Sequence, residues 1–218
     1  MRFETLDEIM ARTGTDKQYK HAYPDIYDQL FWHFRFRPIR MLEIGFAKGR
    51  SARAFGEYFP AATIHVLDHS PSWGSYELLP EEIKSRVHLH KGDQGKPNDI
   101  RAMLDAVANG PKNPKKRGPR KFHVVIDDGC HLSQQQLVSF EELWPHVEDG
   151  GLYIIEDLHI SYGDTVKGWG ESKTMEYFIQ KIHQINKDHA DKEKREKEDI
   201  ESISFPRNMA VIKKKEAR

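Results

Sequence analysis

The chain has 218 residues, of which 38% are hydrophobic, with 34 basic and 34 acidic side chains. This length suits a single domain with its own core, and the zero formal net charge gives no electrostatic reason to expect a nucleic-acid partner. The sequence has one cysteine, no apolar leader and no run of about 18 apolar residues. We therefore expect no intramolecular disulfide, no membrane span and a cytoplasmic location.

Five short apolar runs, each bounded by turn residues, indicate the buried strands of a parallel sheet. They span residues 39–45, 63–68, 86–91, 122–127 and 151–156. Apolar residues at 100–107, 137–147 and 175–185 recur with the period of about 3.6 that is typical of a helix. This alternation predicts an α/β sheet with helices on both faces. The last two runs, 200–205 and 209–213, leave no room for a helix between them and predict an antiparallel hairpin.

Two charge-rich segments interrupt the alternation. Residues 110–121 are basic and could form a patch for nucleic acid or an anionic membrane. Their prolines preclude a regular binding helix, so a solvated loop is the better interpretation. Residues 186–199 are mixed in charge and indicate an exposed helix end or linker.

The first predicted strand leads into a glycine turn that differs from a dinucleotide-binding turn. Gly45 and Gly49 are spaced G-x-x-x-G, whereas a pyrophosphate needs the tighter G-x-G-x-x-G pattern. Glu43 would repel a pyrophosphate but could hold the ammonium group of a methionine moiety. Asp68 ends the second strand, where it could accept hydrogen bonds from a ribose or cap the next turn. We therefore expect S-adenosyl-L-methionine rather than NAD, bound by Glu43, Gly45, Gly49, Ser51, Asp68, and Asp93 and Gln94 near the adenine.

Acidic residues follow the fourth and fifth predicted strands. Asp127 and Asp128 end the one, and Glu156 and Asp157 end the other. Neighbouring parallel strands lie about 4.8 Å apart, so four carboxylates at this edge would repel one another. Mg²⁺ or Mn²⁺, which prefer oxygen ligands, would relieve that repulsion. Successive strand residues point to opposite faces, so we assign the metal to Asp128, Glu156 and Asp157, and leave Asp127 structural or near the cofactor.

His131 follows Asp128 by three residues, after a glycine that permits a sharp turn. A histidine pKa near 6.5 suits it to accept a hydroxyl proton at neutral pH, although a loop histidine with a structural hydrogen bond is the alternative. The predicted reaction has a metal that lowers the pKa of an acceptor hydroxyl, His131 that removes its proton, and an oxygen that attacks the sulfonium methyl group. His21 and His159 are weaker candidates for the base.

Residues 13–27 and the segments LEIGFAKGRS, GDQ, VVIDDGCHLSQQQLVSFEELWP and GGLYIIEDLHISY together resemble one known family. They are similar to the metal-dependent sugar O-methyltransferases of macrolide pathways, the macrocin and mycinamicin type, and to the cephalosporin hydroxylase-like family. The resemblance implies a class I methyltransferase fold, a Rossmann-like sheet of seven strands in the order 3-2-1-4-5-7-6. It also implies a small hydroxylated acceptor, the metal ligands Asp128, Glu156 and Asp157, and His131 as the base.

The N-terminal motif of the same family is matched by Asp16, Lys17, His21, Tyr23 and Tyr27. Lys17 and Tyr23 would either contact the cofactor carboxylate or support the entry helix. The resemblance thus divides the chain into a helical entry segment, 1–37, and a cofactor-binding part, 38–218. Cys130 stands where serine is usual, and we expect no counterpart of the large N-terminal domain of some relatives. A glycine-rich loop with Ser161, Tyr162, Trp169 and Gly170 is predicted to form a lid over the acceptor.

Other functions stay open at this point. An NAD(P)-dependent oxidoreductase would use the same kind of sheet, but the glycine spacing and the terminal hairpin count against it. A binding module without catalysis would not need the three metal ligands and His131. A protein that binds S-adenosyl-L-methionine for a step other than methylation fits the sequence as well. The sequence is also compatible with a homo-oligomer. The acceptor hydroxyl could belong to a sugar, a phenol or a polyketide.

Overall fold

The structure is a computed structural model that describes residues 2–109, 121–162 and 173–217. The predicted lid residues Trp169 and Gly170 and nearly all of the basic segment lie outside the described residues. The chain forms two compact units, residues 1–92 and 93–218. The predicted boundary after residue 37 falls inside the first of these units.

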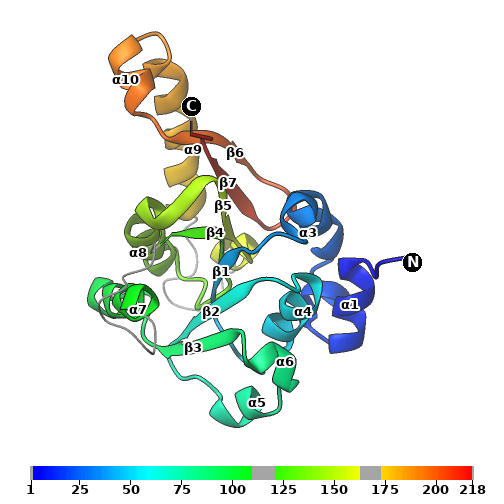
Figure 1. Ribbon diagram of the computed structural model, residues 1–218. Coiled ribbons are helices and arrows are strands. Elements are labelled where there is room, and N and C mark those ends of the chain that lie inside the picture. The colour runs from blue at the N-terminus through cyan, green and yellow to red at the C-terminus, as the bar shows by residue number, and fades with distance from the viewer. Residues whose placement is uncertain (1, 110–120, 163–172, 218) are drawn as a thin grey trace. The chain divides into compact units, whose positions relative to one another are not determined.

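The first unit begins with short helices. These are α1 (Leu6–Thr13), α2 (Asp16–Tyr19), α3 (Pro24–Phe31) and the 3₁₀ turn η1 (Trp32–Phe34). Helix α1 begins with a capping box, in which Thr5 and Glu8 satisfy each other's backbone amides, and it ends at Gly14 with φ +70°. It packs against α3 and α4 (Figure 1). Its apolar side chains are buried there, so the helical segment is part of the core of this unit.

Three parallel strands form the sheet of the first unit. They are β1 (Arg40–Ile44), β2 (Thr63–Asp68) and β3 (Val87–Lys91), and the connecting helices are α4 (Arg50–Tyr58), α5 (Trp73–Glu77) and α6 (Glu81–Lys84). In the register, Ile44 lies beside Leu67, and Asp68 lies beside Lys91. The carboxyl ends of the three strands therefore align, which brings the glycine turn and Asp68 to one edge.

The second unit contains the other four strands. Its elements are α7 (Pro97–Asn109), β4 (Phe122–Asp127), α8 (Ser133–Leu143), η2 (Trp144–His146), β5 (Val147–Ile155), η3 (Leu158–Tyr162), α9 (Lys173–Asp188), α10 (Lys192–Lys197), β6 (Ile200–Ser204) and β7 (Ala210–Lys214). Strands β4 and β5 are parallel, whereas β7 runs antiparallel to both β5 and β6. The predicted terminal hairpin is confirmed, and Figure 1 shows it in orange and red beside β5. The seven strands follow the predicted order, β3-β2-β1-β4-β5-β7-β6.

Two predicted helical faces differ from the observed ones. On α8 the fully buried residues are Gln136, Ser139, Phe140 and Leu143, whereas Leu137 is only partly buried. On α9 Phe178 is buried, but Ile179 is 43% exposed. The predicted stripes were therefore partly wrong, because the interior next to α8 is polar and because α9 buries little more than its first turns.

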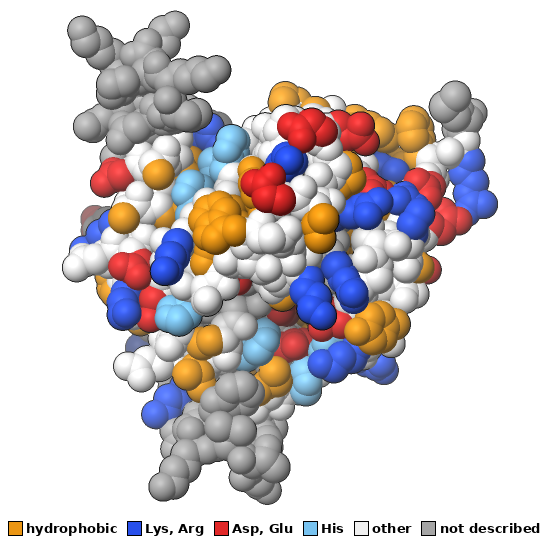
Figure 2. Space-filling model, turned by 90° about the horizontal axis from the view of Figure 1, so that it is seen from below, with side chains coloured by type: hydrophobic (Ala, Val, Ile, Leu, Met, Phe, Trp, Pro, Cys, Tyr) orange, Lys and Arg blue, Asp and Glu red, His pale blue; other side chains and the backbone are white. Residues whose placement is uncertain are grey.

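Two features of the described residues concern the membrane and nucleic-acid partners that the composition gave no reason to expect. No described helix combines the length and the apolarity that a membrane crossing requires. On the face drawn in Figure 2, acidic and basic side chains are interspersed. This distribution accords with the zero formal net charge of the chain.

Candidate active site

The glycine turn after β1 has the backbone that its sequence predicts. Gly45 has φ +98° and donates its amide to the carbonyl of Leu67 at 2.8 Å. Gly49 has φ +70° and is the N-cap of α4. A Cβ atom at Gly49 would lie 2.6 Å from Cζ of Phe46, so the turn needs a glycine on steric grounds as well. Ser51 follows in the first turn of α4 and is half-buried.

Asp68 joins the turns that follow β1 and β2. Its Oδ2 accepts a hydrogen bond from the amide of Phe46 at 2.7 Å, and its Oδ1 accepts one from the amide of Ser70 at 2.7 Å. The turn-capping alternative is thus realised. A carboxylate has about four acceptor positions, so Asp68 retains the capacity to bind a ribose hydroxyl.

Glu43 and Lys17 lie together in the interior of the first unit. Their side chains are 0% and 1% exposed, and Nζ of Lys17 is 3.8 Å from Oε1 of Glu43. A buried carboxylate requires a compensating charge, which α2 supplies here. The sequence predicted each residue for the cofactor but did not predict that they pair. Tyr23, also fully buried, stacks on His21 with ring centroids 5.2 Å apart.

Asp93 and Gln94 begin the second unit, and they differ in surroundings. Asp93 is half-buried, accepts from the amide of Gly95 at 2.9 Å and pairs with Lys96 at 3.3 Å. Gln94 is 6% exposed and donates its Nε2 to both carboxylate oxygens of Asp127, at 3.0 and 3.1 Å. Burial raises the pKa of Asp127 to about 7, although the hydrogen bond from Gln94 lowers it in part.

The acidic ends of β4 and β5 meet at one edge of the second unit, as predicted. The amide of Glu156 donates to the carbonyl of Asp127 at 3.0 Å, so the ends of the two strands stay side by side up to their turns. One ligand atom each from Asp128, His131 and Asp157 lie within 4.8 Å of one another. Two carboxylates and an imidazole at this spacing fit a divalent cation.

Two of these three residues have strained backbones. His131 has φ +60° and Asp157 has φ +57°, in the left-handed region that most side chains avoid. Asp and His tolerate this region better than bulky residues, but it still has an energetic cost, which tends to persist at functional sites. The two turns thus bring the side chains of His131 and Asp157 together with a backbone that is locally strained.

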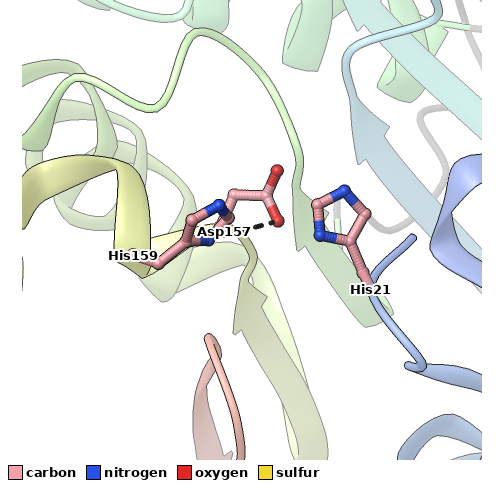
Figure 3. Close-up of side chains that lie close together, drawn as sticks. All are labelled: His21, Asp157 and His159. Atoms are coloured by element: carbon pink, nitrogen blue, oxygen red, sulfur yellow. Dashed lines mark ion pairs between the residues drawn. The ribbon is translucent and has the colours of Figure 1, made fainter. Parts of the chain in front are cut away.

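Glu156 is placed differently from its two predicted partners. It is 1% exposed and belongs to neither of the groups of metal-binding geometry found among the described residues. His131, predicted as a base, lies beside the two aspartates in one of these groups. Nε2 of His131 is 3.9 Å from Oδ2 of Asp157, and its buried Nδ1 has no hydrogen-bond partner among the described residues. Figure 3 shows that Asp157 also forms an ion pair with His159, at 4.0 Å.

Three polar residues that support these turns were missed by the sequence analysis. Ser139 accepts from Nε2 of Gln94 at 3.0 Å, and Gln136 accepts from the hydroxyl of Thr174 at 2.8 Å. All three are fully buried. Gln136, Ser139, Phe140 and Leu143 are spaced i, i+3, i+4 and i+7, so a polar pair within the helical period was the signal available.

A family profile described as a methyltransferase domain matches residues 42–158. The chain is 32% identical over 170 residues to the 8-demethyl-8-alpha-L-rhamnosyl tetracenomycin-C 2'-O-methyltransferase of Streptomyces olivaceus, a match that covers 75% of this chain and 40% of that protein. It is 34% identical over 165 residues to the mycinamicin VI 2''-O-methyltransferase of Micromonospora griseorubida, a match that covers 72% of this chain and 37% of that protein. The chain therefore spans less than half the length of these curated relatives.

The fold is similar to that of a solved structure, MycE methyltransferase in complex with Mg, S-adenosylhomocysteine (SAH) and mycinamycin VI. The TM-score is 0.74 and the identity 28%, over 99% of this chain and 56% of that one. A second similar structure, an SAH-bound methyltransferase from Podospora anserina, has a TM-score of 0.57 at 17% identity, a likeness of fold alone.

Proposed function

The chain belongs to the methyltransferase domain family, and on that premise we propose that it transfers the methyl group of S-adenosyl-L-methionine to a hydroxyl group of a small acceptor, with Mg²⁺ or Mn²⁺ as a second cofactor. One observation carries the proposal: Asp128, His131 and Asp157 converge within 4.8 Å at the ends of two parallel strands. This convergence offers both the oxygen ligands for a hard cation and a base beside them.

The carboxylates of Asp128 and Asp157 would hold the metal. Glu156 is kept in the proposal as a third ligand, since it precedes Asp157 directly. A bound divalent cation supplies a Lewis acid that lowers the pKa of the acceptor hydroxyl. Mg²⁺ prefers oxygen over imidazole, which leaves His131 beside the metal and not bound to it.

His131 removes the hydroxyl proton in this proposal. Nδ1 accepts the proton because it has no hydrogen-bond partner among the described residues, and Asp157, 3.9 Å from Nε2, stabilises the imidazolium that forms. The acceptor oxygen forms a bond to the methyl carbon, the carbon–sulfur bond breaks, and its electron pair stays on sulfur. The products are the methyl ether and SAH.

Several of the residues proposed for the cofactor follow β1 and β2 in the first unit. Gly45, Gly49 and Ser51 would face the methionine arm, above the buried pair of Glu43 and Lys17. Asp68 would bind the ribose, since its two backbone contacts leave acceptor positions on the carboxylate. Asp93 is proposed for the adenosine from its place in the sequence. Tyr23 and Asp127 are fully buried, and each is proposed to support the cofactor residues of its own unit from the interior.

A sugar hydroxyl is the acceptor that we propose. The curated relatives are named for O-methylation of a rhamnosyl tetracenomycin and of mycinamicin VI, and the first of these names contains a sugar. A role in secondary metabolism and a cytoplasmic location belong to the same proposal; the location rests on the single cysteine.

The cofactor part is tested by thermal unfolding with SAH and with NAD⁺, each with and without MgCl₂. We expect SAH, but not NAD⁺, to raise the unfolding temperature, because a ligand that binds the native state stabilises it. Methyl transfer to mycinamicin VI, rhamnosyl tetracenomycin C and a simple catechol is then followed by mass spectrometry. Stabilisation by NAD⁺ and not by SAH would overturn the proposal.

The catalytic assignments are tested by substitution. His131→Ala should lower kcat by about 100-fold or more and leave SAH affinity nearly unchanged, because a general base contributes about 10² to 10⁴ in rate. Asp128→Asn should abolish both activity and its metal dependence. The matched control is His183→Ala, an exposed histidine on α9, which should behave as wild type. Full activity in His131→Ala would remove the base assignment.

A further inference from the structure

A single buried amide connects the loop after β3 with the turn after β4. Gln94 donates Nε2 to Asp127 and to Oγ of Ser139 at 3.0 Å, and its Oε1 accepts from the amide of Cys130 at 2.8 Å. A glutamine amide has two N–H donors and one carbonyl acceptor. Both donors and the acceptor are therefore engaged inside the protein, with the end of β4, the turn that follows it and helix α8.

These anchor points flank the proposed functional residues. Asp127 immediately precedes Asp128, and Cys130 immediately precedes His131. The turn between them has a strained residue at His131, with φ +60°. A short turn that is held at both positions 127 and 130 has little freedom to relax that strain, so the directions of the Asp128 and His131 side chains are set by the anchors.

A second contact supports the other acidic turn from the same helix. Gln136, on α8 one turn before Ser139, approaches the carbonyl of Glu156 with its Nε2 at 3.5 Å and accepts from Thr174. Sγ of Cys130 donates to Oε1 of Gln135 at 2.8 Å. Helix α8 thus presents two buried polar side chains, Gln136 and Ser139, toward the acidic turns. Gln94, in the loop after β3, bonds both to Ser139 and to the turn that carries Asp128 and His131.

We propose that Gln94 is a positioning residue for Asp128 and His131, and that it does not read the adenine edge as its place in the sequence suggested. The inference rests on the proposed function, since it concerns the metal and base of that reaction. Hydrogen-bond partners beyond the ligands themselves commonly change metal affinity by about 10- to 100-fold when they are removed. Gln94 fits that description because its amide holds the carboxylate of Asp127 and the backbone amide of Cys130, on either side of Asp128.

The test is Gln94→Met, which keeps the length of the side chain and removes every hydrogen bond. Three quantities are measured: Mn²⁺ affinity by electron paramagnetic resonance without donor or acceptor, SAH affinity by calorimetry, and hydrogen exchange of the Cys130 amide by NMR. We expect Mn²⁺ affinity to fall about 10- to 100-fold. SAH affinity should change by less than about threefold, while the Cys130 amide loses its acceptor and exchanges faster.

The reverse pattern, weaker SAH binding with unchanged Mn²⁺ affinity and unchanged Cys130 exchange, would show a cofactor contact and overturn the proposal. If the wild-type chain binds no divalent metal, the proposed function fails, whereas the positioning role is still decided by the Cys130 amide. If Gln94→Met does not fold, Gln94→Glu keeps the side-chain shape and the oxygen for Cys130 but removes both donors. It should still lose Mn²⁺ affinity and keep SAH affinity.

Two further variants separate positioning from general damage. Ser139→Ala removes one acceptor of the amide but leaves both anchors of the turn, so Mn²⁺ affinity should stay within about threefold of wild type. Gln184→Met, at an exposed position of α9, should match wild type in all three measurements. A loss in Ser139→Ala as large as in Gln94→Met would refute a specific role for the anchors.

Discussion

Replacement of Gly49 by alanine should strongly destabilise the first unit. The residue has φ +70°, which costs a residue with a Cβ atom about 1–2 kcal/mol. The new Cβ would lie 2.6 Å from Cζ and 2.9 Å from Cε2 of Phe46, and that ring is only 1% exposed. Forcing a methyl group into such a packed site costs a further ~1–3 kcal/mol. The expected total is about 2–5 kcal/mol, a large part of the roughly 5–15 kcal/mol by which proteins are stable.

Urea unfolding at 25 °C measures this loss directly, and calorimetry with SAH tests whether the turn also loses cofactor affinity. The matched control is Gly74→Ala in α5, where a Cβ atom would meet nothing within 4 Å and φ is ordinary. Alanine should be neutral there or stabilising by up to about 1 kcal/mol. If Gly49→Ala unfolded within about 0.5 kcal/mol of wild type, the steric account of this turn would be wrong.

Two further predictions concern stability. Burial lowers the pKa of His65 to about 3, so the native state favours the neutral imidazole. The contribution of this group to the free energy of unfolding is complete above the unfolded pKa near 6.5 and is lost as the pH falls below that value. Between pH 7 and pH 5 this group should lower the free energy of unfolding by about 2 kcal/mol. That loss should be absent in His65→Leu and present in His69→Leu, the control at an exposed histidine, when both are unfolded in urea at the two pH values. Arg86 donates to the carbonyls of four residues, two of them at the end of α4. Arg86→Met should therefore cost about 2–4 kcal/mol of stability, whereas exposed Arg2→Met should cost no more than about 0.5 kcal/mol; equal stabilities would contradict the role of these hydrogen bonds.

Most strands could be predicted because each is a short apolar run between turn residues. The second and fourth strands, 63–68 and 122–127, match β2 and β4 residue for residue. Strand β5 begins earlier than predicted, at Val147, because Val147 pairs with Phe122 before the regular ladder resumes at Leu152. The pairing of β4 with β5 is irregular between Phe122 and Val124, and such an interruption leaves no trace in the period of the apolar residues.

The meeting of the acidic residues was predictable for a topological reason. Parallel strands end at the same edge, so residues that follow β4 and β5 approach each other whatever their side chains are. Which of them face a common point depends on the backbone after each strand. Asp157 and His131 take positive φ values there, and no count of residues along an alternating strand predicts that reversal. These turns bring His131 beside Asp128 and Asp157, and the assignment of Glu156 to the metal stays a prediction.

The polar face of α8 explains why a helical pattern can be correct in its period and wrong in its face. The apolar residues at 137, 140, 144 and 147 have helical spacing, but so do Gln136, Ser139 and Phe140. A search for apolar period favours the first set, because a buried glutamine usually costs free energy. That cost disappears where the neighbouring interior offers partners, and Gln94 and Thr174 offer them here. A polar pair at core spacing, on the helix that follows an acidic turn, is thus itself evidence for a buried hydrogen-bond network that holds the turn in place.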